Sequence, residues 1–226
     1  MKIIDITGLI YTGMWDYGPP FPSYQLKEIP NPEWLSYKVY MEEFAGLSSQ
    51  TGTYLETPAH SLGYEKSYPL IDVPVEKLVN VPTYVIQLDM EKLPLIDGRR
   101  AITKQALLDN CDEKKMKDCR CILVSTGWGK FWKEKNYAHD APFFKYEAME
   151  WIVSKRPFML AADSSRWENI KKFEGFFPIF FGANILMLAP CVNTEKISRE
   201  VVELTVLPLK IEKTCCVPCR AIVMEK

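Results

Sequence analysis

The segment between residues 121 and 162 limits most strongly how this chain can fold. Two apolar runs, at residues 121–125 and 158–162, have the length of buried strands and end in polar residues. Between them, residues 143–155 carry apolar side chains at helical spacing: Phe144, Ala148, Trp151 and Ile152. A strand, a helix and a strand in this order predict a right-handed crossover between two parallel strands. At the carboxyl end of the first strand, Thr126-Gly127-Trp128 predicts a turn, and such ends collect ligand contacts in α/β sheets.

The rest of the chain predicts further short elements around this crossover. We expect strands at residues 2–7, 34–44, 84–88, 185–188, 201–209 and 221–224. Thr103 is placed to cap a helix that runs to Asp109, and residues 167–173 suggest another helix. Residues 34–44 are expected to pair with the segment that begins at Gln50, and residues 13–30 to form an ordered loop. No repeat or linker is evident, so residues 1–226 are predicted to be one domain.

Charge and cysteine usage exclude several classes of partner. With a net charge of −1 and interspersed acids and bases, no basic face for nucleic acid or an anionic membrane is implied. Asp5 interrupts the N-terminus before an apolar region forms, which argues against a signal peptide. Seven cysteines, an odd number, fit reduced thiols in a cytoplasmic protein. Cys216-Val-Pro-Cys219 has the spacing of half a zinc site, but buried or idle thiols are the favoured interpretation.

Residues 50–60 concentrate the candidate chemistry. The β-favouring residues before Pro58 predict a strand, on which Gln50, Tyr54 and Glu56 share one face. His60 follows directly after the proline turn. The alternative is an edge strand with a solvated polar face and a structural histidine.

This segment resembles the signature of the metal-dependent cyclase/hydrolase family that includes bacterial kynurenine formamidase and isatin hydrolase. The family signature runs His-x-Gly-Thr-His-x-Asp-x-Pro-x-His, and the chain matches it at Gly52, Thr53, Pro58 and His60. Later landmarks occur in the family's order: Ser125-Thr-Gly-Trp128, Ala162-Asp-Ser-Ser165, Leu207-Pro-Leu-Lys210 and Pro218-Cys-Arg220. The resemblance covers nearly the whole chain. It implies an α/β single domain with a mixed, barrel-like β core and surrounding helices, and a homodimer or homotetramer.

The metal ligands of the family are replaced here. Gln50 and Tyr54 stand where the family has metal-binding histidines, and Glu56 stands where it has a bridging aspartate. The resemblance also places Phe177 and Ala189 near a later histidine and glutamate of the family. Zinc favours cysteine, histidine and carboxylate, so we predict no transition-metal cofactor. A hard cation such as Mg²⁺ or Ca²⁺ on the oxygens of Gln50, Tyr54 and Glu56 is the alternative.

The retained residues suggest acid/base chemistry. The family uses the position of His60 as a proton shuttle, and histidine's ordinary pKa suits that role at neutral pH. We therefore predict His60 and Glu56 as an acid/base pair, with Tyr54 and Gln50 as hydrogen-bond donors to a carbonyl or developing oxyanion.

Three more residues are predicted to contact substrate. Trp15 is a candidate pocket wall, with a core or subunit contact as its alternative. Asp163 and Ser165 are candidates for orienting the substrate, although capping of the next helix is the favoured role. His139 is predicted to lie in a loop.

The predicted function is a small-molecule hydrolase or cyclase resembling kynurenine formamidase. It would act on an amide, lactam or lactone carbonyl, or break a C–C or C–O bond by isomerisation or elimination. The alternative is a catalytically silent member that binds a small ligand or serves as a structural subunit.

Overall fold

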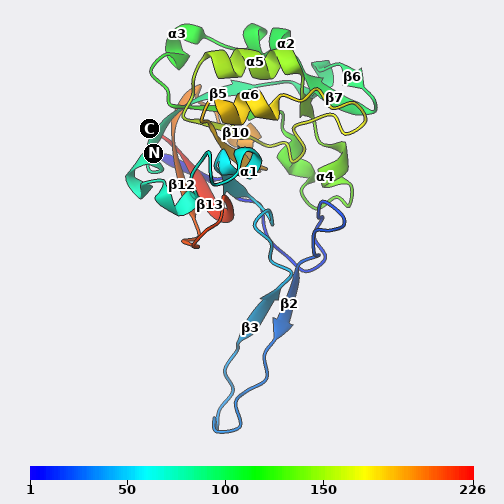
Figure 1. Ribbon diagram of the computed structural model, residues 1–226, viewed down its shortest axis with the longest axis vertical. Helices are drawn as coiled ribbons and strands as arrows, with labels where there is room; N and C mark the ends of the chain where they lie inside the picture. The colour runs from blue at the N-terminus through cyan, green and yellow to red at the C-terminus, as the bar shows by residue number, and fades with distance from the viewer.

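A computed structural model describes residues 1–226, and its centre is a closed β-barrel of seven strands (Figure 1). Strands pair in the order β13, β12, β5, β8, β10, β11 and β4, and β4 pairs back onto β13. An eighth strand, β1, also pairs with β13, in antiparallel orientation. The bounds of the eight strands are Lys2–Asp5 (β1), Tyr54–Glu56 (β4), Val81–Gln87 (β5), Cys121–Ser125 (β8), Met159–Ala162 (β10), Leu186–Ala189 (β11), Val201–Pro208 (β12) and Cys216–Glu225 (β13). The predicted α/β fold with a mixed, barrel-like core is confirmed.

The crossover predicted from the sequence joins β8 to β10. These strands are parallel, with Leu123 opposite Ala161, and α5 (Tyr146–Ser154) lies between them in the chain. The predicted helix at residues 143–155 begins later than expected, because Phe143–Phe144 forms the short strand β9, which pairs with β7 (Arg99–Ile102). Thr103 caps α2 (Lys104–Asp109) as predicted, since its hydroxyl accepts a hydrogen bond from the backbone of Ala106.

The remaining elements are short. The other helices are α1 (Ala59–Leu62), α3 (Glu113–Met116), α4 (Tyr137–Asp140) and α6 (Phe177–Gly182), with single 3-10 turns at Leu70–Asp72, Val75–Lys77, Met90–Lys92, Trp128–Phe131 and Thr194–Lys196. The other strands are β2 (Gln25–Glu28), β3 (Glu42–Ala45) and β6 (Leu95–Ile96). The longest helix, α5, has nine residues, so none has the length and apolar surface to cross a bilayer.

Alternation along the strands separates two cores. Leu55, Leu123 and Leu188 belong to a cluster formed by the side chains on one face of every barrel strand. This cluster fills the barrel. The opposite face, with residues such as Val124 and Leu160, packs under α2, α5 and α6. Because Tyr54 and Glu56 alternate with the inward-facing Leu55, they lie on the outer wall of the barrel.

Two sequence predictions are wrong. Residues 34–44 do not pair with the segment at Gln50. Instead, β3 pairs with β2 in an antiparallel hairpin that projects from the body of the protein (Figure 1). β2 and β3 are neighbours in the chain, and the turn-rich connection between them contains Pro30 and Pro32. Residues 167–173 form turns rather than a helix, because the Glu168 carboxylate accepts hydrogen bonds from the backbone of residues 174–176 and stabilises a non-helical path.

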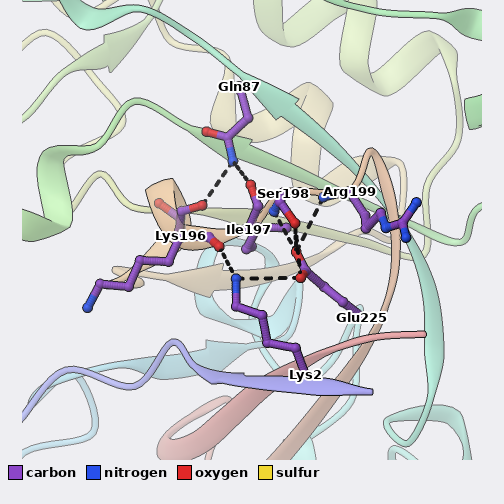
Figure 2. A network of polar contacts seen from close by, with 8 residues as sticks. Lys2, Gln87, Lys196, Ile197, Ser198, Arg199 and Glu225 are labelled. Carbon is purple, nitrogen blue, oxygen red and sulfur yellow. Dashed lines mark hydrogen bonds and ion pairs between the residues drawn. The ribbon is translucent and has the colours of Figure 1, made fainter.

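A polar network lies at the end of β13 (Figure 2). The Glu225 carboxylate accepts hydrogen bonds from the backbone of Ser198 and Arg199 and from the Ser198 hydroxyl. Lys2 pairs with Glu225 at 3.5 Å and donates to the carbonyl of Lys196. The Gln87 amide donates to the carbonyls of Thr194 and Ile197. The network therefore ties β1, β5 and β13 to one connecting segment.

Candidate active site

A cavity of about 430 Å³ lies against the outer wall of the barrel. Four segments contribute to its lining, at residues 17–21, 50–60, 165–173 and 177–187. Gln50, Tyr54, Glu56 and His60 all line it, so the structure brings together the four polar residues of the predicted site. Phe177, where the resemblance implies a later histidine, also lines the cavity.

The segment that carries these residues is less regular than predicted. Only Tyr54–Glu56 is a strand, because residues 48–51 form a turn in which the Ser48 backbone donates to the Thr51 hydroxyl. Gly52 then adopts a positive φ of 74°, and a Cβ there would meet Ile10 Cγ1 at 2.8 Å. A larger residue would be both strained and crowded at this position. The turn directs the Gln50 amide back to the Glu56 carboxylate, with an Nε2–Oε1 distance of 2.6 Å.

Glu56 is the buried acid of the site, with 1% of its side chain exposed. Burial raises its pKa above the ordinary value of 4.5, while His60 and the hydrogen bonds from Gln50 and the Cys216 thiol oppose that rise. The His60 Nδ1 atom lies 3.7 Å from Glu56 Oε1, which is a charge contact rather than a close hydrogen bond. The predicted acid/base pair is therefore adjacent but not directly bonded.

His60 has a second partner that the sequence does not reveal. It lies on the one-turn helix α1, near Cys215. Interaction with the Cys215 thiol is the largest cause that raises the pKa of His60 above 6.5, and Glu56 adds to it. In turn, His60 and the Tyr64 hydroxyl lower the pKa of Cys215. The contact arises because the backbone of Thr57 pairs with Cys215 across β4 and β13, so no pattern local to residues 50–60 signals it.

Tyr54 is bonded to a second phenol, that of Tyr17. Their oxygens are 2.7 Å apart, and the Tyr17 hydroxyl donates to the Ser165 carbonyl at 3.1 Å. Burial raises the pKa of both hydroxyls above 10, so both are neutral donors at ordinary pH. Tyr17 lies in the same aromatic-rich loop as Trp15, the residue that the sequence predicts as a pocket wall.

Trp15 is not a wall of this cavity. It packs against Trp132 and Tyr137, with ring centroids 5.0 and 4.8 Å away, in a separate aromatic cluster. This core position matches the alternative interpretation of Trp15. Tyr17, two positions further along the loop, does line the cavity.

Asp163 and Ser165 have different positions. Asp163 is fully buried away from the cavity, where its carboxylate accepts from the backbone of Thr126 and Trp128 and from the Thr194 hydroxyl. It therefore anchors loops, and no helix follows that it could cap. Ser165 lines the cavity, but its hydroxyl donates to the Ala138 carbonyl.

Neither remaining candidate adds a metal ligand. His139, predicted in a loop, is exposed on the one-turn helix α4 and does not line the cavity. Ala189, where the resemblance implies a glutamate, pairs with Tyr54 between β11 and β4. No three side chains of histidine, cysteine, aspartate or glutamate are grouped so that they could hold a metal ion.

Known proteins share this fold over the full chain. An isatin hydrolase bound to the product analogue thioisatinate superimposes with a TM-score of 0.80 at 20% identity, covering 100% of this chain and 93% of the other. Isatin hydrolase A from Ralstonia solanacearum gives 0.77 at 17% identity, covering 98% and 91%. A structure described as a potential metal-dependent hydrolase with cyclase activity gives 0.72 at 20% identity, covering 100% and 99%.

Sequence comparison supports the same relationship. No curated protein sequence matches the chain. A family model described as "Putative cyclase" does match it, over residues 4–169, which include the signature segment and most of the cavity lining. The chain therefore belongs to the cyclase family described by that model.

Proposed function

We propose that this protein is a hydrolase or cyclase that acts on the carbonyl group of a small amide, lactam or lactone, with Glu56 and His60 moving the protons. The observation that carries the proposal is the buried Glu56 carboxylate beside His60 in a cavity large enough for a one-ring substrate. Family membership and the shared fold support the reaction class. Specificity for a formamide like that of kynurenine is a finer proposal, which rests on the signature resemblance alone.

The directions of the pKa shifts suggest which residue does what. The raised pKa of His60 shifts its equilibrium toward the protonated form, which suits a general acid. Glu56, whose ordinary pKa is the lower of the two, is assigned the role of general base. In this mechanism Glu56 removes a proton from water, the water oxygen attacks the carbonyl carbon, and His60 protonates the departing nitrogen or oxygen. When substrate binds, the neutral Tyr54 hydroxyl exchanges its hydrogen bond to Tyr17 for one to the developing oxyanion.

We further propose that the reaction proceeds without a transition metal. The residues at the family's ligand positions do not fit zinc or manganese: the Gln50 amide donates to Glu56, and Tyr54 is a neutral phenol bonded to Tyr17. For a hard cation, Glu56 would be the only anionic ligand among these residues, which is fewer than such ions favour.

Metal analysis of the purified protein together with a substrate screen tests both proposals. We expect turnover of at least one small formamide, lactam or lactone that survives treatment with a chelator. Stoichiometric zinc or manganese would refute the metal-free mechanism. Binding of these compounds without turnover would instead identify a silent, ligand-binding family member.

Self-association is also proposed, from the projecting β2–β3 hairpin. Its large apolar side chains are exposed: Leu26, Trp34, Tyr37, Tyr40 and Phe44. So many exposed aromatic residues on one arm are typical of a contact surface. A second copy of the chain is the partner implied by the family resemblance, and light scattering of the purified protein tests for it.

A further inference from the structure

Arg166 is a guanidinium on the cavity wall with few protein partners. Its Nη2 atom donates to the Tyr17 carbonyl at 2.7 Å, and its central carbon lies 5.2 Å from the centre of the Tyr17 ring. Its Nε atom is buried and has no acceptor. The arginine ion pairs of the chain are those of Arg100 with Glu91 and Arg220 with Asp5, so the charge of Arg166 is not neutralised by a carboxylate.

The neighbouring Arg99 provides a contrast. Its guanidinium donates to the carbonyls of Ala141, Pro142, Arg166 and Glu168, which satisfies its hydrogen bonding within the fold. Burial, together with the charge of Arg166, lowers the pKa of Arg99 to about 10. Two cations are thus held close together, and only one of them is saturated by protein acceptors. A structural arginine in this position would be expected to resemble Arg99.

The acidic side chains around the cavity have partners other than Arg166. The Glu168 carboxylate is directed to the backbone of residues 174–176, and Glu56 is bonded to Gln50. The ring of Tyr17 has Arg166 over its face and Tyr54 at its hydroxyl. A ligand that extends along this ring can therefore reach Arg166 at one end and the proposed reacting groups at the other. Phe21, Phe173 and Phe177 add an apolar lining suited to a planar ring.

We propose that Arg166 forms an anion subsite, so that the natural ligand of this cavity is a ring compound bearing a carboxylate apart from the carbonyl that reacts. A guanidinium matches a carboxylate with two parallel hydrogen bonds. The single negative charge of a carboxylate suits a cavity that also contains two glutamates, whereas the doubly charged phosphate group would be repelled more strongly. This inference names the substrate class for the proposed function and rests on it.

Calorimetry with three matched probes tests the subsite: benzoate, neutral benzamide and phenyl phosphate. We expect benzoate to bind the unaltered protein more tightly than the other two. In Arg166→Met, benzoate affinity should fall about tenfold or more while benzamide affinity stays the same, because a charge-assisted hydrogen bond is lost. Arg199→Met, an exposed site outside the cavity with the same change in net charge, is the control and should bind benzoate normally.

The outcomes separate this inference from the proposed reaction. Equal binding of benzoate and benzamide, or an equal loss of both in Arg166→Met, would overturn the subsite. Tighter binding of phenyl phosphate would overturn the choice of a carboxylate. If Arg166→Met does not fold, Arg166→Lys retains the charge without the two-pronged geometry and should show a smaller, benzoate-selective loss. Glu56→Gln should still prefer benzoate over benzamide even if no substrate is ever turned over.

Discussion

A buried glutamate lies at each end of strand β13, Glu56 on the neighbouring β4 and Glu225 on β13 itself, and the two differ in what surrounds them. At its start, Cys216 pairs with Glu56 in the cavity, and at its end Glu225 enters the network of Figure 2. Both side chains are covered, 1% and 6% exposed, but Glu56 lies deep in the protein whereas Glu225 lies close to the surface. Burial nevertheless raises the pKa of Glu56, whereas hydrogen bonds from Ser198 and Arg199 together with Lys2 lower the pKa of Glu225.

The difference shows how one fold surrounds two carboxylates so that their pKa values shift in opposite directions. Glu225 is held in its charged form by backbone donors of a connecting segment, so it stabilises the closed barrel. Glu56 accepts from one side chain, that of Gln50, and it faces a cavity. A proton can therefore be exchanged at Glu56 without breaking the barrel.

The largest effect is expected from replacing the reactive carboxylate. Glu56→Gln should lower turnover of an identified substrate by about 10²- to 10⁴-fold, since it removes a general base while keeping the size of the side chain. Its melting temperature should stay the same or rise, because the folded state no longer buries a charge whose pKa is raised. Activity assays and calorimetry on the same preparation measure both. Full activity in this variant would show that Glu56 is not the general base.

Glu225→Ala should have the opposite profile. We expect a loss of about 1–3 kcal/mol in the free energy of unfolding at neutral pH, because backbone donors lose their acceptor. Turnover per folded molecule should be unchanged. The folded-state pKa of Glu225 is lowered, so its stabilisation is present above the ordinary value of 4.5 and is lost as the pH falls through the folded-state pKa.

Denaturant titrations across pH measure this effect. The difference between Glu225→Ala and the unaltered protein should shrink in acid. A difference that instead grew in acid would contradict the assigned role.

The smallest effect concerns the pH profile and Cys215. Activity should rise with pH through the pKa of Glu56, above 4.5, and fall through the pKa of His60, above 6.5. Cys215→Ala removes the largest cause that raises the pKa of His60, so the alkaline limb should move to lower pH with little change in stability. Titration of the His60 resonance by NMR checks the shift directly. Cys219→Ala, a buried cysteine outside the cavity, is the control and should leave the limb in place.

Much of the scaffold could be predicted because its signals are local. The β8–α5–β10 crossover follows from apolar runs and helical spacing within 42 residues, from 121 to 162. The hairpin of β2 and β3 was missed, since its exposed apolar residues give a pattern that also fits a buried strand. The turn at Glu168 was missed as well, because a side chain bonded to a backbone competes with helix formation only in three dimensions.

The candidate site divides in the same way. Gln50, Tyr54, Glu56 and His60 could be grouped from one short segment, and the structure places them around one cavity. Tyr17, Arg166 and Cys215 could not be grouped with them, because they come from a loop, a strand connection and the bend just before β13. Trp15 and Tyr17 are aromatic residues of the same loop, and only the structure shows that Tyr17 lines the cavity while Trp15 packs against Trp132.

The sequence by itself determined the β8–α5–β10 crossover through its hydrophobic periodicity and the polar set at residues 50–60 through chain proximity. The barrel was implied by the resemblance to the family. Only the tertiary structure decided how each titratable group behaves. Glu56 and Glu225 are the same residue type in strands of one sheet, yet their pKa values move in opposite directions. The free energy of a buried charge depends on the donors that surround it, and those donors arrive from segments far apart in the chain.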